Sequence, residues 1–485
     1  MSHLVIRNKN EAYVTIDCEE GVSYELRDHF TFTVPGYQFT PQFRNKIWDG
    51  RIRLFNVRSR EIYRGLVPHI TKFCKEFDHT YEYEDTTEEF SLLEAQDFIS
   101  TLGLPEQFVP RDYQVDGFVH AIRNKRILLL SPTGSGKSLM LYLILRKIVD
   151  QGKVLIIVPT VNLVEQLASD FKNYGFDSDT LIHKIHAGIE KDSNKPIIIS
   201  TWQSLFRLPP KYFHQFKSVI CDEVHLAKAK SLTDILIKLV YTKYRFGTTG
   251  TLDGMKTNRL VLEGLFGSVR QVTTTKTLID NQTLADFEVK CLLLKHDPKV
   301  SGALKKADYQ TEIEYLINSD SRNQFIINLA LSLKDNTLIL FNYIRHGEEL
   351  KRLVEAKVEK SRPVYFIYGK TEADIREESR HLIEKSTNAI ILASSGVFST
   401  GVNIVNLNSV IFASPSKSRI RVLQSIGRVL RRSDSKISSV LFDIADDLTH
   451  KKHENHTYKH FTTRLQYYAE EKFKFRMYKI TLKGK

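Results

Sequence analysis

The chain has 485 residues, with 70 Lys and Arg against 57 Asp and Glu, and a formal net charge of +13. At roughly 150 residues per domain this length predicts about three domains, and hydrophobic and charged fractions of 42% and 26% exclude wholesale disorder and a membrane-embedded fold. The four separated cysteines form no C-x-x-C pair, which excludes a zinc module and a disulfide framework. Because no apolar signal segment opens the chain, we expect a reduced, cytoplasmic protein whose positive charge is compatible with a polyanionic partner.

The N-terminal region, residues 1–90, combines a basic stretch with an acidic one. Residues 42–64 hold seven Arg and Lys with interleaved aromatic residues, and residues 76–97 hold nine acidic residues without Lys or Arg. Cations neutralise phosphates and aromatic rings stack on exposed bases. We therefore expect a small α+β DNA-binding domain followed by an acidic connector, although the aromatic residues could instead form a small core with Arg outside it. The candidate DNA-binding residues are Arg44, Lys46, Trp48, Arg51 and Arg53.

Short apolar runs followed by helical patterns recur through the rest of the chain. Buried strands that alternate with helices predict right-handed βαβ crossovers and parallel sheets covered on both faces. We expect two tandem α/β domains, at residues 91–285 and 286–450, and then a basic helical tail at residues 451–485. The expected strands are Arg126–Leu130, Val154–Val158, Pro196–Ser200, Ser218–Cys221 and Tyr244–Gly247 in the first domain, and Thr337–Phe341, Val364–Ile367, Ala389–Leu392, Val410–Phe412 and Val440–Phe442 in the second.

The most specific motif is a phosphate-binding loop at residues 131–138, directly after the first of these strands. Its sequence, SPTGSGKS, matches G-x-x-x-x-G-K-[ST] except that Ser131 replaces the first glycine. In such a loop the Lys neutralises the β- and γ-phosphates and the Ser ligates Mg²⁺. The alternative is an ordinary glycine-rich turn. The expected nucleotide-binding residues are Thr133, Gly134, Ser135, Gly136, Lys137 and Ser138.

Two adjacent carboxylates follow the expected strand Ser218–Cys221, in the tetrad DEVH at residues 222–225. The carboxyl end of a parallel strand is where α/β proteins bind ligands. There Asp222 would hold Mg²⁺, together with Ser138, and Glu223 would orient and deprotonate a water molecule; His225 completes the catalytic tetrad. Two adjacent carboxylates in a loop are, on their own, often solvated surface groups without a catalytic role. Beside a phosphate loop, such a pair predicts hydrolysis of ATP with Mg²⁺ as the cofactor.

Further motifs occur in order across residues 111–432, and together with the DEVH tetrad they resemble those of superfamily 2 DExH-box helicases. They include RDYQ at 111–114, VPT at 158–160, STWQ at 200–203, GTTGT at 247–251, STGVN at 399–403 and QSIGRVLR at 424–431. The resemblance implies two RecA-like parallel-sheet domains that share one ATP between them. A basic helix face is the alternative for the last motif.

The resemblance also implies roles for individual residues. Arg111 and Gln114 would bind the nucleotide, with Gln114 reading adenine, and Gly401 would touch the nucleotide. Gln424, Arg428 and Arg431 would act in catalysis, with an arginine finger on the γ-phosphate. Contacts to the nucleic-acid strand would come from Thr160, Thr201 and Thr400.

The N-terminal residues indicate a particular family within superfamily 2. The segments PGYQF at 35–39, FR at 43–44 and WDGRIRL at 48–54 are similar to the N-terminal domain of the bacteriophage UvsW-type recombination helicases. That family remodels forks, Holliday junctions, D-loops and R-loops. The resemblance implies a monomeric motor on branched duplex and single-stranded DNA, without a membrane partner, and a host-cytoplasm location if the chain is phage-encoded.

Three alternatives to a DNA helicase and branch-migration motor remain open at this point. One is a duplex translocase that hydrolyses ATP without separating strands. Another is an RNA helicase, which the DEVH tetrad and the N-terminal segments disfavour. The third is an annealing protein for which ATP acts as a switch.

Overall fold

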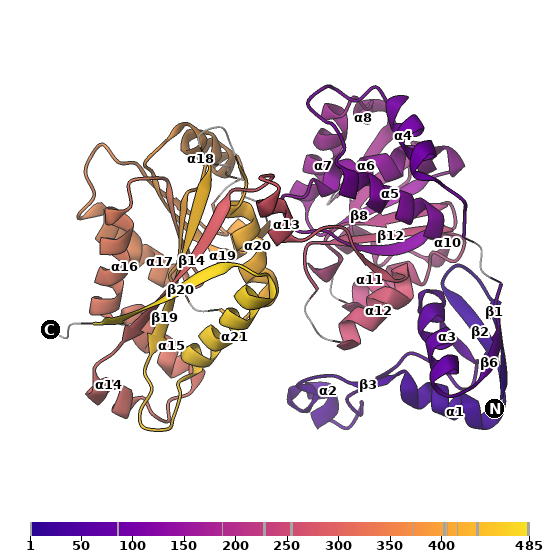
Figure 1. Ribbon diagram of the computed structural model, residues 1–485, viewed down its shortest axis with the longest axis horizontal. Helices are drawn as coiled ribbons and strands as arrows, with labels where there is room; N and C mark the ends of the chain where they lie inside the picture. The colour runs from indigo at the N-terminus through magenta and orange to yellow at the C-terminus, as the bar shows by residue number, and fades with distance from the viewer. Residues whose placement is uncertain are drawn as a thin grey trace. The chain divides into compact units, whose positions relative to one another are not determined.

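Two large parallel sheets and one small mixed sheet form the framework of the chain (Figure 1). The structure is a computed structural model that describes all residues except 1, 85–86, 187, 227–228, 253–255, 372, 401–403, 405, 415, 433–435 and 483–485. The chain divides into two units, residues 1–131 with 136–273 and residues 132–135 with 274–485. Among the described residues, none of the helices is both long and apolar enough to cross a bilayer.

The N-terminal domain is a four-stranded sheet of order β5-β2-β1-β6, with α1 and α3 packed on it. Alternate residues of β1 and β2, including Leu4, Ile6, Val14 and Ile16, are buried, as expected for a sheet with one face on a core. The predicted α+β character of this domain is therefore confirmed. Its elements are β1 (His3–Asn8), β2 (Tyr13–Asp17), α1 (Glu20–His29), β5 (Glu61–Tyr63), η2 (Arg64–Leu66), α3 (Val67–Glu76) and β6 (Thr80–Glu82).

An arm, residues 31–53, extends from this domain between α1 and β5 and carries α2 and β3 in Figure 1. Its two short strands pair antiparallel with each other and with no other strand that the structure describes. Gly50 has a φ of +79°, and a Cβ there would lie 2.2 Å from the Tyr37 ring, so only glycine fits this turn. The elements of the arm are β3 (Thr31–Thr33), η1 (Tyr37–Phe39), α2 (Pro41–Arg44) and β4 (Arg51–Arg53).

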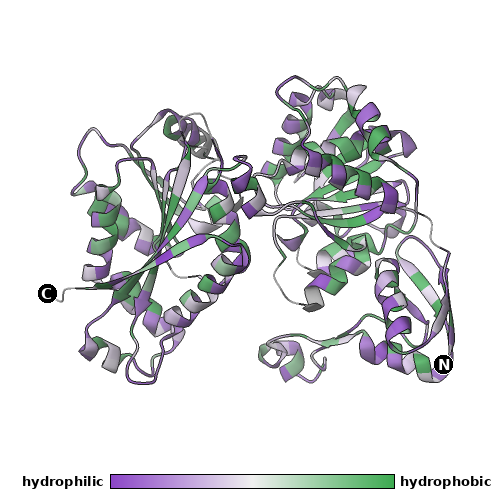
Figure 2. Cartoon of the chain, in the orientation of Figure 1, coloured by the Kyte–Doolittle hydropathy of each residue, from purple (hydrophilic) through white to green (hydrophobic). Residues whose placement is uncertain are grey.

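The first α/β domain is a seven-stranded parallel sheet of order β13-β7-β12-β11-β8-β10-β9. Along β8, Val154, Ile156 and Val158 join the core under α5, α6 and α7, while Leu155 and Ile157 join the core on the other face. Figure 2 shows hydrophobic residues concentrated on the central strands. The sheet is therefore covered on both faces, as predicted.

The elements of this domain are α4 (Leu92–Ser100), α5 (Asp112–Asn124), β7 (Arg126–Leu130), α6 (Lys137–Ile148), η3 (Val149–Gln151), β8 (Val154–Val158), α7 (Val161–Asn173), α8 (Ser178–Leu181), β9 (Ile182–Ile185), β10 (Ile197–Thr201), α9 (Trp202–Leu205), α10 (Pro210–Phe213), β11 (Ser218–Cys221), η4 (Val224–Leu226), α11 (Ala229–Leu236), β12 (Tyr244–Thr249), α12 (Lys256–Phe266) and β13 (Val269–Gln271).

The second α/β domain is another seven-stranded parallel sheet, of order β16-β17-β15-β18-β19-β14-β20. Its elements are α13 (Thr275–Asp280), β14 (Asp286–Lys295), α14 (Pro298–Ala303), α15 (Tyr309–Asn318), α16 (Asp320–Ser332), β15 (Thr337–Phe341), α17 (Ile344–Glu355), β16 (Val364–Ile367), α18 (Ala373–Lys385), β17 (Ile390–Ser394), α19 (Ser395–Thr400), β18 (Ser409–Phe412), α20 (Arg419–Val429), β19 (Ser438–Asp447), α21 (His456–Glu470) and β20 (Lys474–Thr481). Two tandem parallel-sheet domains were predicted, and the structure has both.

The C-terminal segment belongs to this second sheet. Helix α21 buries Phe461, Arg464 and Tyr468, and β20 pairs in parallel with β14. The guanidinium of Arg464 donates to both carboxylate oxygens of Asp443, at 2.9 and 2.8 Å, and the Tyr468 hydroxyl donates to the same carboxylate at 2.9 Å. The predicted helix is present, but one of its basic residues is internal and β20 was not predicted.

Replacing Arg464 with Met should destabilise the second unit by about 3 to 5 kcal/mol, because a buried carboxylate then loses its cationic partner. Urea unfolding, followed by far-UV circular dichroism, measures this loss as a lower midpoint urea concentration. Lys459→Ala, on an exposed position of the same helix, is the control and should leave the midpoint unchanged. An unchanged midpoint for Arg464→Met would show that the ion pair contributes nothing.

Candidate nucleotide-binding site and nucleic-acid interface

The phosphate loop connects the end of β7 to the start of α6. Gly134 and Gly136 have φ angles of +84° and +77°, in the left-handed region that glycine adopts without strain. Ser131, the departure from the motif, is buried and its N–H donates to the Thr249 carbonyl at 2.9 Å. Its φ is not positive, so this position does not require the glycine that the motif usually has. The loop therefore keeps the backbone features that bind phosphate at a helix N-terminus.

The upstream element RDYQ lies against this loop at the start of α5. Gln114 is 3% exposed; its Nε2 donates to the Gly136 carbonyl at 3.0 Å, and its Oε1 accepts from the Arg111 N–H at 2.8 Å. Arg111 is exposed, and its Nη1 donates to the Tyr113 hydroxyl at 3.0 Å. Gln114 therefore links the predicted adenine-reading element directly to the phosphate loop.

Replacing Gln114 with Ala should raise the KM for ATP about 10-fold, equivalent to about 1.4 kcal/mol, because a buried amide that supports the loop is lost. Steady-state ATPase assays with ATP and GTP measure the change, and the preference for ATP should shrink. Gln107→Ala, which removes an exposed amide upstream, serves as the control. Unchanged KM values for both nucleotides would contradict the assignment of Gln114.

The two carboxylates follow β11 and lie beside the lysine of the loop. The Lys137 ammonium donates to Glu223 Oε1, and Asp222 Oδ1 accepts from the Thr248 hydroxyl at 2.6 Å. Burial opposes ionisation of Glu223, but the charge of Lys137 outweighs it and lowers the pKa of Glu223 below its usual range. Glu223 has a φ of +49°. A non-glycine residue in this region is strained, and such strain clusters at functional sites.

His225 connects this pair to the end of β12. Its Nδ1 lies 2.5 Å from the Thr249 hydroxyl and 3.3 Å from Glu223 Oε2, and its side chain is 2% exposed. Thr248 and Thr249 belong to the GTTGT motif that the sequence indicated, although no role was predicted for either residue. The Thr248 hydroxyl donates to Asp222 and the Thr249 hydroxyl lies beside His225, so this motif directly contacts the DEVH tetrad.

The donor set here fits a magnesium ion. The Ser138 hydroxyl and the Asp222 carboxylate are hard oxygen donors of the kind that Mg²⁺ prefers. Burial raises the pKa of Asp222, and a nearby dication would favour its ionised form. No cluster of three His, Cys, Asp or Glu side chains suited to a metal occurs in the described part of the chain. A magnesium site of two protein ligands, completed by substrate oxygens and water, is consistent with that.

The predicted strand-contacting residues of the first domain lie at the starts of two helices. Thr160 caps α7, where its hydroxyl accepts from the Leu163 N–H at 3.4 Å. Thr201 is 4% exposed and its hydroxyl bonds to Ser204 at 3.1 Å, so its side chain is turned inward. The side chain of Thr400, and Gly401 as a whole, lie outside the described residues.

The candidate arginine-finger motif lies on α20 of the second domain. Gln424 is 7% exposed, Arg428 is half-buried with its guanidinium carbon 6.0 Å from the centre of the Phe398 ring, and Arg431 follows the helix and bridges to Leu284. The helix begins at a Ser418 cap whose hydroxyl accepts from the Arg421 N–H. The three predicted residues therefore lie on or directly after one helix.

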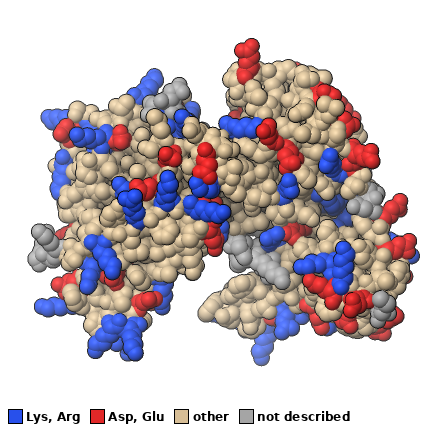
Figure 3. Space-filling model, viewed as in Figure 1, with Lys and Arg blue, Asp and Glu red and all other residues tan. Residues whose placement is uncertain are grey.

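The arm carries the predicted DNA-binding residues. Arg44, Lys46 and Arg51 are exposed, whereas Arg53 pairs with Asp49 and Trp48 is half-buried with its indole N–H on the Arg51 carbonyl at 2.9 Å. A groove of about 780 Å³ is lined by Arg44, Lys46, Trp48, Asp49 and Arg53. Phe39 and Ile47 are 70% and 76% exposed, and Figure 3 shows the arm, at the lower centre, as largely uncharged on that face. The sequence did not single out these two apolar residues.

Three family models match successive parts of the chain. Residues 4–84 match the family DNA helicase UvsW, N-terminal, residues 107–254 match Type III restriction enzyme, res subunit, and residues 321–433 match the helicase conserved C-terminal domain. The ATP-dependent DNA helicase uvsW of Enterobacteria phage T4 is 36% identical over 97% of this chain and 98% of its own length. The chain belongs to the UvsW family of superfamily 2 helicases.

Solved structures agree with this membership. The crystal structure of UvsW from bacteriophage T4 covers 99% of this chain and 100% of its own, with 34% identity and a TM-score of 0.53. A fragment of a putative HsdR subunit of a type I restriction enzyme from Vibrio vulnificus covers 89% of this chain and 76% of its own, with a TM-score of 0.59 and 18% identity. The second likeness shows the fold alone. The UvsW-family chain therefore has the two RecA-like domains and the small N-terminal domain that its sequence predicted.

Proposed function

We propose that this UvsW-family chain is an ATP-dependent DNA helicase that unwinds or branch-migrates forks, Holliday junctions, D-loops and R-loops in recombination, repair and replication. The observation that carries the proposal is the contact between the Lys137 ammonium of the phosphate loop and the Glu223 carboxylate after β11. It brings a phosphate-neutralising cation and a general base together at the carboxyl edge of one parallel sheet. The exposed basic arm in the same unit supports DNA as the substrate.

ATP hydrolysis at this site needs a positioned water and a neutralised phosphate. The backbone N–H groups of residues 133–136 and the start of α6 bind the phosphates, and Lys137 leaves Glu223 for the β- and γ-phosphate oxygens. Glu223 then accepts a proton from the water that attacks the γ-phosphorus, and the bond to the β,γ-bridging oxygen breaks. Ser138 and Asp222 would hold Mg²⁺, which supplies charge neutralisation on the phosphates.

The remaining groups act on the nucleotide and on the coupling of hydrolysis to DNA. Arg428 and Arg431 are proposed to stabilise the charge that develops on the γ-phosphate, with Gln424 positioning them. His225 connects the proposed base Glu223 to Thr249, and Thr248 contacts Asp222, so the GTTGT motif is proposed to couple the state of the nucleotide to the DNA contacts. Successive cycles of ATP hydrolysis would move these DNA contacts along a strand.

The arm is proposed to engage the branch point. Arg44, Lys46 and Arg51 neutralise phosphates, while Phe39, Ile47 and Trp48 offer apolar surface to bases that are exposed at a junction. A monomer holds both RecA-like domains, so the motor needs no second copy, and the proposed location is the cytoplasm, that of a bacterial host if the chain is phage-encoded.

A double replacement, Arg44→Ala with Arg51→Ala, should weaken DNA binding uniformly across sequences and lower the slope of log K against log[salt] by about two, since two phosphate contacts are lost. Fluorescence anisotropy with a forked duplex, at several stated salt concentrations, measures both quantities. Lys72→Ala with Lys75→Ala removes two exposed cations of α3 in the same domain and is the control. Equal slopes for the two double variants would remove the arm from the DNA interface.

Two assays separate the helicase from the alternatives. Displacement of a triplex-forming strand without unwinding of a fork would identify a duplex translocase. Greater stimulation of ATPase activity by RNA than by DNA would identify an RNA helicase. The proposal predicts fork unwinding and stimulation by DNA, and unimpaired remodelling when ATP hydrolysis is blocked would instead support an annealing protein.

A further inference from the structure

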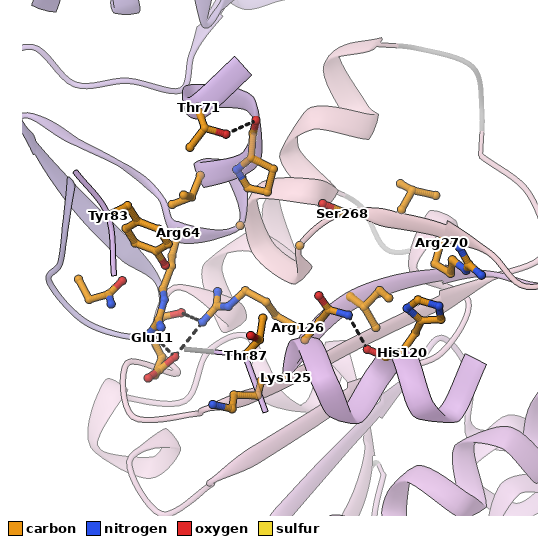
Figure 4. A pocket seen from close by; sticks show the side chains of 18 of the residues that line it. Glu11, Arg64, Thr71, Tyr83, Thr87, His120, Lys125, Arg126, Ser268 and Arg270 are labelled. Carbon is orange, nitrogen blue, oxygen red and sulfur yellow. Dashed lines mark hydrogen bonds and ion pairs between the residues drawn. The ribbon is translucent and has the colours of Figure 1, made fainter. Parts of the chain in front are cut away.

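A second basic site lies where the N-terminal domain packs on the first RecA-like domain. A cavity of about 960 Å³ opens there, at the start of β7, whereas the phosphate loop follows the end of that strand. Figure 4 shows residues of the N-terminal domain, including Arg64 and Tyr83, facing Lys125, Arg126 and Arg270 of the RecA-like domain. The cavity is therefore separate from the nucleotide site at the other end of the sheet.

The N-terminal domain and the first RecA-like domain pack closely against each other around this cavity. A Cβ on Gly65 would lie 2.1 Å from the Glu263 carbonyl oxygen, and one on Gly264 would lie 2.8 Å from the Tyr63 ring, so the two backbones touch. The N–H of Glu11 donates to the Val240 carbonyl at 3.0 Å, and His69 pairs with the buried Glu263. The cavity is thus a built feature of the packed domains.

Buried positive charge lines its inner wall. Glu11 Oε2 accepts from both Arg64 Nη1, at 2.7 Å, and Arg126 Nη2, at 2.8 Å, so one carboxylate is shared by two guanidinium groups. Behind them, the fully buried Arg245 donates to the carbonyls of residues 236, 239 and 242. Burial and the charge of the neighbouring arginine lower the pKa of Arg126 to about 10 and that of Arg245 to about 9. Both remain protonated at neutral pH.

The decisive observation is that these two arginines have unused donors. Arg126 Nη1 and Arg245 Nη1 are both buried and make no hydrogen bond to any residue that the structure describes. A buried cationic donor without a partner is costly, and such a group in a native protein calls for an ion, water or ligand that satisfies it. An anion in the cavity would meet the charge of Arg126 directly and screen its repulsion with Arg245.

The outer wall adds exposed cations and aromatic rings. Lys243 pairs with Glu88 at 2.8 Å and Arg270 with Asp116 at 3.0 Å, and both cations are nearly half exposed, so each can turn toward a ligand. Tyr81 is 37% exposed, and it lines the cavity together with Tyr83 and His120. The volume exceeds that of a phosphate several times over. Cations beside tyrosine rings suit a phosphate with an attached base.

We propose that this cavity is a second binding site for a nucleotide phosphate, in which Arg126, Lys243 and Arg270 attract the phosphate and Tyr81 or Tyr83 stacks on the base. The phosphate can belong to a DNA strand or to a free nucleotide. The DNA source rests on the proposed function; the anion site itself does not.

Photo-crosslinking tests the site and distinguishes the two sources. An oligonucleotide that carries 4-thiothymidine and, separately, 8-azido-ATP are irradiated with the full-length protein, and the crosslinked peptides are mapped by mass spectrometry. A crosslink within residues 78–84 or 120–127 is expected, from the oligonucleotide if a DNA strand is the ligand and from azido-ATP if a free nucleotide is. No crosslink in either segment with either probe overturns the proposal.

Matched variants provide a second readout. Lys243→Ala with Arg270→Ala should reduce crosslinking at those segments and, for DNA, lower the slope of log K against log[salt] by about two. Lys172→Ala removes an exposed lysine that is likewise paired with a carboxylate, Asp179, at 2.6 Å, and should change neither. Crosslinking equal to that of Lys172→Ala would also overturn the proposal. Fork unwinding by the wild type is measured independently, so failure of this site and failure of the helicase proposal are distinguishable.

Discussion

Replacing Lys137 with Ala should abolish ATP hydrolysis and strand separation while DNA binding persists. Its ammonium is the proposed cation for the β- and γ-phosphates, and without it the charge on the leaving phosphates would not be neutralised. We expect kcat for ATP to fall at least about 100-fold, a loss of about 2.7 kcal/mol of transition-state stabilisation. Coupled-enzyme ATPase assays and fluorescence anisotropy with a forked duplex measure the two activities.

The matched control for this variant is Lys211→Ala. Lys211 is an exposed lysine of α10 in the same unit, so its loss should leave both activities unchanged. Strand separation by Lys137→Ala at the wild-type rate would show that ATP hydrolysis does not drive remodelling. Loss of DNA binding together with ATPase activity would show that the substitution disturbs more than the phosphate site.

Replacing Glu223 with Gln should nearly abolish hydrolysis while ATP binding is retained. The amide keeps the size of the side chain but cannot accept the proton of the attacking water, and general-base catalysis contributes about 10² to 10⁴ in rate. The variant also loses the charge that faces Lys137, which frees the ammonium for phosphate. We therefore expect the Kd for ATP to stay the same or fall, as measured by equilibrium binding of a fluorescent ATP analogue.

Glu190→Gln, which changes an exposed carboxylate of the same unit, controls for the substitution itself and should retain full activity. Wild-type turnover by Glu223→Gln would exclude Glu223 as the base. A large rise in the Kd for ATP would instead assign Glu223 a role in binding.

Much of the framework could be predicted because strands buried on both faces have a distinctive local signal. The bounds of β7, β8, β11 and β15 coincide with the predicted apolar runs, since continuous hydrophobicity is the signal of a central parallel strand. The bounds of the edge strand β16 coincide as well. The phosphate loop and the DEVH tetrad were predictable for a similar reason. Their residues are contiguous in the chain, and each motif directly follows a strand.

Charged residues that become internal could not be predicted from local sequence. Arg464 occurs among polar neighbours, and Arg126 follows Asn124 and Lys125 at the start of an apolar strand. Their partners Asp443 and Glu11 come from other parts of the chain, in the second case 115 residues away. The exposure of Phe39 and Ile47 was likewise not predicted, because apolar residues are more often buried. In each case, tertiary contacts or their absence determine whether the side chain is buried or exposed.

Strand separation on a forked DNA duplex, compared with ATP and with a non-hydrolysable ATP analogue at one stated salt concentration, tests the account most directly. The wild-type chain should separate the fork with ATP and Mg²⁺, should fail with the analogue or with EDTA present, and should lose the activity in Lys137→Ala and Glu223→Gln. Equal separation with ATP and with the analogue, or ATP hydrolysis on the fork without any separation, would contradict a hydrolysis-driven DNA helicase.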